Sequence, residues 1–159
     1  MEMRPTGKET NMITTTMTSE KALAGFGNGI DCSQAVFAEL APQLGVDRET
    51  ALKISACFGG GMWEGETCGA VVGAIMAIGL KYGQGDTVDP DKKNAMLAKA
   101  AAFRAKFAEK YSNCVCKEVL GYKIPEEMEQ IMAENKFGNV CCHLVTDACR
   151  ICAEILNEE

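Results

Sequence analysis

Apolar residues recur along most of this chain at the three- and four-residue spacing of amphipathic helices, and no segment alternates convincingly as a strand does. Short breaks that contain glycine, aspartate or proline separate the helical segments. Asp31, Asp47 and Asp89 each stand where a side-chain oxygen can cap a helix, and Pro90 follows at a favourable first helical position. The pattern predicts an all-α fold, a compact bundle of about six to eight helices without a substantial sheet.

The caps and breaks also predict where each helix lies. We expect helices over residues 18–26, 32–41, 48–58, from 66 or 67 to about 82, 90–111, 125–135 and 140–156. Residues 114–116 are expected at a junction before a short segment that ends at Gly121. The three glycines Gly59, Gly60 and Gly61 are predicted to form a loop. Gly69, Gly73 and Ala77 form a line of small residues on one helix, so a second helix can approach closely there, either within the chain or in a homodimer.

Length and composition favour one domain. The chain has 159 residues, of which 47% are hydrophobic, and this suffices for a core without disulfide bridges. Residues 1–17 are polar and rich in threonine, so we expect a mobile N-terminal segment before a single cysteine-rich domain over residues 18–159. No apolar stretch reaches the length of a signal peptide or a membrane span, which predicts a cytoplasmic protein without a membrane span.

The charge pattern argues against nucleic acid as a partner. The net charge is −6 and the basic residues are scattered, whereas a nucleic-acid surface needs a basic stripe. No nucleotide site is predicted either, because residues 59–61 lack the lysine and the serine or threonine that follow in a phosphate loop. A small molecule, a metal or a protein partner is the expectation that remains.

Nine cysteines carry the main functional signal. They are Cys32, Cys57, Cys68, Cys114, Cys116, Cys141, Cys142, Cys149 and Cys152. An odd number cannot pair completely within the chain, so reduced thiols or metal thiolates fit better than a disulfide framework. No C-x-x-C-H motif occurs, which excludes attachment of haem c. Because the cysteines are spread along the chain, only the fold can bring them together.

The local settings of the cysteines differ. Cys32 and Cys68 stand at predicted helix starts, where the helix dipole favours a thiolate, and the glycines before Cys68 let backbone N–H groups approach an inorganic group. At least one of Cys114 and Cys116 is expected to be functional. Those on apolar helical faces are expected to belong to the core, namely Cys57, Cys149 and Cys152. His143, the only histidine, is expected to be exposed on a helix.

Several sequence blocks resemble a known family. The blocks are Asp31-Cys32-Ser33-Gln34-Ala35-Val36, Phe58-Gly59-Gly60-Gly61-Met62, the stretch from Gly65 to Ala74, the stretch from Cys116 to Gly121 and the stretch from Cys141 to Ala148. In this order they resemble the redox-active family named after its C-GCAxxG-C-C pattern, whose core is a CGAxxG motif. The resemblance covers the chain from about Ser19 to the C-terminus, and the family is similar to the iron–sulfur region of the split-Soret cytochromes.

The resemblance implies a site of four cysteines, which are Cys32, Cys68, Cys116 and Cys141 in this chain. Cys114 and Cys142 are the alternatives to their near neighbours Cys116 and Cys141. The glycines expected to contact a bound cofactor are Gly59, Gly60, Gly61 and Gly69.

Four cysteines of this kind predict a 2Fe–2S or 4Fe–4S cluster for electron transfer or redox sensing, with a partner protein or a small molecule as electron donor or acceptor. Structural zinc uses the same ligands. The alternatives are a thiol–disulfide oxidoreductase in which Cys68 attacks and a second cysteine resolves the bridge, and a helical module without catalytic activity.

Overall fold

The structure is a computed structural model, and it describes residues 11–158. The α-helices are α1 (Ser19–Gly27), α2 (Cys32–Leu40), α3 (Arg48–Ile54), α4 (Gly69–Tyr82), α5 (Pro90–Tyr111), α6 (Cys116–Leu120), α7 (Met128–Ala133) and α8 (Cys142–Asn157). Shorter helical turns cover Ala41–Leu44, Gly61–Gly65 and Phe137–Cys141. Within the described range the only β contact is one isolated bridge. The predicted all-α fold is confirmed.

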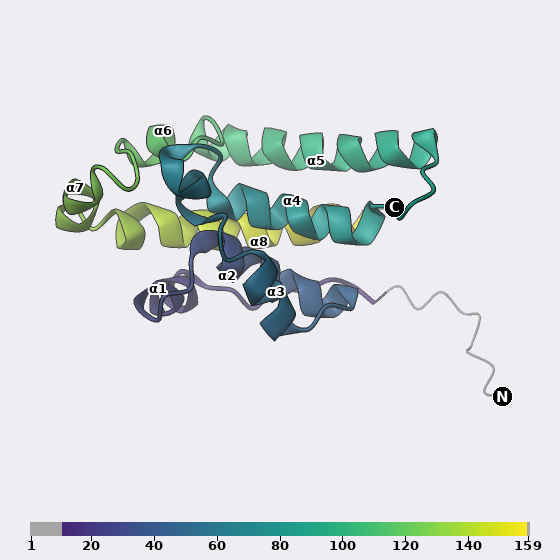
Figure 1. Cartoon of the computed structure of the whole chain (residues 1–159), viewed down its shortest axis with the longest axis horizontal. Helices are drawn as coiled ribbons and strands as arrows, with labels where there is room; N and C mark the ends of the chain where they lie inside the picture. Colours follow the sequence, from purple (N-terminus) through teal and green to yellow (C-terminus); the bar gives the residue numbers. More distant parts are fainter. Residues whose placement is uncertain (1–10, 159) are drawn as a thin grey trace.

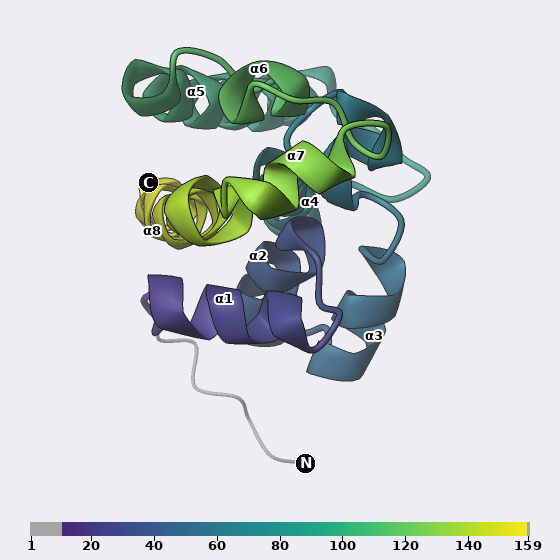
Figure 2. The same cartoon turned by 90° about the vertical axis from the view of Figure 1, so that its left-hand side faces the viewer.

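The helices form three layers. In Figure 1, α5 lies above α4 and α8, and α1, α2 and α3 lie below them. Figure 2 shows the same order from the end of the bundle, where α1, α6 and α7 lie toward the viewer. Both α4 and α8 begin at this end of the molecule. Residues 11–158 contain no helix that is both long and apolar enough to cross a bilayer.

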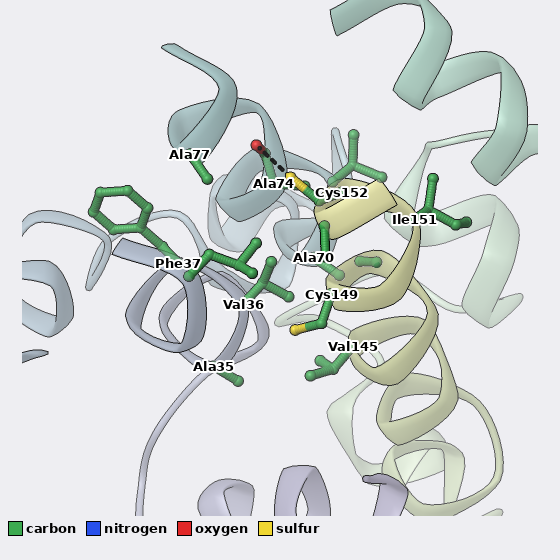
Figure 3. Close-up of a cluster of buried hydrophobic side chains, with 14 of the residues drawn as sticks. Ala35, Val36, Phe37, Ala70, Ala74, Ala77, Val145, Cys149, Ile151 and Cys152 are labelled. Carbon is green, nitrogen blue, oxygen red and sulfur yellow. Dashed lines mark hydrogen bonds between the residues drawn. The ribbon is translucent and has the colours of Figure 1, made fainter. Parts of the chain in front are cut away.

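The main core lies between α2, α4 and α8 (Figure 3). Val36 from α2, Ala74 from α4 and Val145 from α8 are all fully buried there. Cys149 and Cys152 are fully buried in the same cluster, and the Cys152 thiol donates to the carbonyl oxygen of Ala74 at 3.4 Å. The prediction that these two cysteines belong to the core is confirmed.

The line of small residues on α4 brings this helix against α2. A Cβ atom on Gly73 would lie 2.6 Å from the carbonyl oxygen of Ser33 and 3.0 Å from Cβ of Val36. The neighbouring helix contacted at Gly73 is therefore α2 of the same chain. Ser33 is itself fully buried, and its hydroxyl donates to the carbonyl oxygen of Ser55 at 2.8 Å.

Two segments depart from the sequence expectations. Helix α3 ends at Ile54, and the chain then turns toward the glycines, so that Cys57 is exposed and the prediction that it belongs to the core is wrong. At the N-terminus, residues 1–10 of the expected mobile segment lie outside the described residues. Residues 11–17, which precede the expected domain boundary at 18, contact the helical domain. Ile13 is buried, and its N–H donates to the side-chain oxygen of Asn157 at 2.7 Å.

Candidate four-cysteine site

Four cysteines stand at the starts of four different helices. Cys32 is the first residue of α2, Cys68 caps α4, Cys116 is the first residue of α6 and Cys141 precedes α8. Asp31 fixes the start of α2 through a reciprocal capping box with Gln34. The helix starts that sequence patterns predicted for Cys32 and Cys68 are confirmed.

A short backbone pairing joins the segments that precede α4 and α6. The N–H of Cys68 donates to the carbonyl oxygen of Cys114 at 2.7 Å, and the N–H of Cys116 donates to the carbonyl oxygen of Glu66 at 2.6 Å. These two bonds flank the isolated antiparallel bridge of the fold. The pairing therefore holds the backbones of Cys68 and Cys116 side by side, although the residues are far apart in the sequence.

Gly69 lets the starts of α2 and α4 meet. A Cβ atom at this position would overlap with Sγ of Cys32 and would lie 3.1 Å from both Cα of Gly59 and the carbonyl oxygen of Phe58. Two of these three neighbours are backbone atoms, which cannot move aside as a flexible side chain can. Only glycine fits here without displacing the Cys32 sulfur.

The glycine run forms a left-handed turn instead of an irregular loop. Gly60, Gly61, Met62 and Trp63 have positive φ values of 60°, 63°, 62° and 56°. Glycine adopts this conformation freely, whereas it costs about 1–2 kcal/mol at each of Met62 and Trp63. A Cβ on Gly61 would also lie 2.8 Å from Cβ of Cys116, so this turn packs directly behind the site.

Cys32, Cys68, Cys116 and Cys141 line one cavity of about 530 Å³. Gly60 and Gly69 line it as well, whereas Gly59 and Gly61 lie behind its wall. In the described part of the chain, no three His, Cys, Asp or Glu side chains are grouped to hold a metal ion. The four sulfurs therefore share a cavity without converging on the position of one ion.

The other cysteines lie away from this cavity. The Cys142 thiol donates to the carbonyl oxygen of Gly138 at 3.0 Å, and the half-buried Cys114 sulfur faces the carbonyl oxygen of Arg104 at 3.9 Å. All nine cysteines belong to the described range, and none is paired in a disulfide. His143 is exposed, as expected, and its Nδ1 lies 2.9 Å from the Ser19 hydroxyl.

Burial controls the protonation of the four thiols. It raises the pKa of Cys116 to about 12, and together with the neighbouring thiols it raises the pKa of Cys68 and Cys141 even more strongly. The pKa of Cys32 is also raised by burial, and the Gly60 N–H partly opposes this. The expectation that helix starts favour thiolates at Cys32 and Cys68 is thus overruled by desolvation. These raised pKa values favour the protonated thiols at neutral pH, and a bound cation would favour their deprotonation.

The sequence patterns did not indicate the remaining cavity wall. Most of it is apolar and comes from α1, α6, α7 and the turn before α8, with Asp31 and Asn135 as polar members. Phe26 and Phe137 contact each other across this wall at a centroid distance of 6.0 Å. Trp63 also lines the cavity, and its ring packs on Gly60, although 48% of the residue is exposed.

Fold and site together define an all-α protein that gathers four cysteines around a largely apolar cavity. Residues 30–155 match the family model described as "Putative redox-active protein (C_GCAxxG_C_C)". The match spans most of the chain, so the protein belongs to this family, and the resemblance seen in the sequence blocks is confirmed. Neither the curated proteins nor the solved structures contain a match to the chain.

Proposed function

We propose that Cys32, Cys68, Cys116 and Cys141 hold an iron–sulfur cluster and that the protein transfers electrons or senses redox state in the cytoplasm. The observation that carries the proposal is the shared cavity of these four cysteines, each placed at a different helix start. Four cysteine thiolates are the usual ligands of 2Fe–2S and 4Fe–4S clusters, and a bound cluster would supply one-electron chemistry.

The surroundings of the four sulfurs suit such a group. A cluster held by four thiolates carries negative charge, which the N-terminal ends of α2 and α4 stabilise through their unpaired N–H groups. At the start of α8 the Cys142 N–H already donates to the carbonyl oxygen of Phe137. The Gly60 N–H is directed to the Cys32 sulfur, and hydrogen bonds of this kind raise the reduction potential of a cluster. Burial of Cys68 and Cys141 excludes water from the thiolates.

The experiment compares serine variants after anaerobic purification, with iron and acid-labile sulfide as readouts. Cys116→Ser and Cys141→Ser are expected to lose most of both. Their near neighbours provide matched controls. Cys114→Ser, two residues from Cys116, and Cys142→Ser, next to Cys141, make the same sulfur-to-oxygen change and should keep the iron and sulfide contents of the wild type. Equal losses in a variant and its neighbour control would contradict the ligand assignment.

The same preparations test the alternatives. Zinc bound without iron would assign the four cysteines to a structural metal site. A metal-free protein that forms one specific disulfide after mild oxidation, and forms none in Cys68→Ser, would assign them to thiol–disulfide exchange. Either result would refute the iron–sulfur proposal.

A further inference from the structure

The cavity is larger and more apolar than four sulfur ligands require. Its volume of about 530 Å³ lies within the range of roughly 300–1,000 Å³ that is typical of small-molecule sites. Away from the cysteines the wall is built from α1, α7, the glycine turn and the turn before α8. Its apolar side chains include Leu23, Phe26, Trp63, Met128, Met132 and Phe137.

The side chains that line the cavity give an anionic organic ligand no cationic partner, and the helix N-termini that stabilise negative charge lie at Cys32 and Cys68. All the lining residues belong to the described part of the chain, and they include no lysine, arginine or histidine. Asp31 is the only carboxylate among them, and Asn135 supplies an amide that can donate or accept a hydrogen bond. A phosphate or carboxylate ligand would meet Asp31 without any cation to pair with, so an uncharged ligand is favoured.

The side chains of the wall favour an aromatic ligand. Phe26 and Phe137 form a tilted pair, and the Trp63 ring, which packs on Gly60, lines the same cavity. Aromatic rings bind other rings through tilted or offset contacts, and the methionine sulfurs of Met128 and Met132 contact ring edges favourably. The wall thus offers partners for both the faces and the edges of a planar molecule.

The opening of the cavity is bordered by exposed apolar residues. Leu23, Trp63 and Met132 are 44%, 48% and 61% exposed, although each lines the cavity. A concave site of this volume, walled by several elements, fits a small molecule better than the flat face of a protein partner.

We infer that the apolar part of this cavity binds an uncharged, planar aromatic molecule beside the four cysteines. This inference goes beyond the proposed function, since the binding surface consists of apolar side chains and requires no iron. The cavity would then have two parts: sulfur ligands on one portion of the wall and an organic ligand on the other.

The probe for this site is N-phenyl-1-naphthylamine, an uncharged fluorescent molecule with two aromatic systems. Trp63 is the only tryptophan of the chain, so its emission reports occupancy of the cavity. We expect saturable binding of one probe per chain, with enhanced probe emission and quenched Trp63 emission. The anionic analogue 1-anilinonaphthalene-8-sulfonate has the same rings and should bind about tenfold more weakly, because its sulfonate lacks a cationic partner.

Two surface variants locate the probe. Leu23→Ala and Met132→Ala remove apolar contacts from partly exposed positions, so the fold should be retained, and each is expected to weaken binding about threefold to tenfold. Leu97→Ala is the matched control, since Leu97 is 50% exposed on α5 and does not line the cavity. Circular dichroism checks the fold of each variant.

Three results would overturn the inference: unsaturable binding without quenching of Trp63, equal affinity for the sulfonated analogue, or an equal loss of affinity in Leu97→Ala. Iron is measured in the same samples. If protein purified without iron binds the probe, this inference stands and the iron–sulfur proposal fails. If iron-loaded protein does not bind the probe, the iron–sulfur proposal stands and this inference fails.

Discussion

Substitution of Gly69 by alanine tests the packing on which the site depends. The added methyl group would overlap with the Cys32 sulfur and press on two backbone atoms at 3.1 Å. Overpacking of this kind costs about 1–3 kcal/mol, while the better helix propensity of alanine returns at most about 1 kcal/mol. We therefore expect Gly69→Ala to lower the free energy of unfolding by about 1–2 kcal/mol and to displace Cys32.

Gly79 provides the matched control on the same helix. A Cβ atom on Gly79 meets nothing within 4 Å, and its φ lies in the ordinary range, so Gly79→Ala should stabilise the protein by about 0.5–1 kcal/mol. Urea unfolding followed by circular dichroism measures both variants, and iron content is determined on the same anaerobic preparations. The reasoning would be refuted if Gly69→Ala were as stable as Gly79→Ala and held as much iron as wild type.

Further predictions concern charge and buried hydrogen bonds. Burial raises the pKa of Cys116 from an ordinary 9.0 to about 12, so between these pH values the folded state binds more protons than the unfolded state. The free energy of unfolding should therefore fall as pH rises from about 9 to about 12, by up to about 1.4 kcal/mol per pH unit for each thiol with such a shift. Urea unfolding of iron-free protein across this pH range measures the fall. Burial alone would raise the pKa of Asp147, but hydrogen bonds from Lys110 and Tyr111 lower it below its ordinary value. The ionised Asp147 side chain therefore stabilises the folded state above the ordinary pKa, and this stabilisation is lost as pH falls through the lowered pKa. Asp147→Asn should cost about 1–2 kcal/mol at neutral pH and nothing in strong acid, as measured by thermal unfolding across pH. Ser33→Ala should cost about 0.5–1.5 kcal/mol in urea unfolding, because the buried Ser55 carbonyl loses its short bond from the Ser33 hydroxyl and keeps only the longer one from the Phe58 N–H at 3.4 Å.

Local sequence signals predicted the helices well because their caps and breaks are local. The Asp89-Pro90 pair predicted the start of α5, and the helix ends at Tyr111 as expected. The end of α3 was predicted too late, because Cys57 continues an apolar spacing that the following glycine turn interrupts. The spacing of apolar residues cannot indicate this early helix end, because the end depends on how the glycines pack against α2 and α4.

The juxtaposition of the cysteines depends on contacts between distant segments. Sequence blocks indicated all four cysteines, but not how Cys116 comes to lie beside Cys68. The bonds that place them together join backbone atoms: the Cys68 N–H donates to the Cys114 carbonyl oxygen, and the Cys116 N–H donates to the Glu66 carbonyl oxygen. The aromatic wall was missed for a similar reason. Phe137 has the apolar character of any core residue, and only the packing shows that it faces a cavity.

The most direct test for a cluster on the four cysteines is the iron and acid-labile sulfide content of the full chain purified without oxygen. We expect a brown protein that contains iron and inorganic sulfide in equal amounts, and both should be lost together when Cys68 is replaced by serine. A colourless preparation that is free of iron under these conditions, with the four thiols intact and titratable, would contradict this prediction.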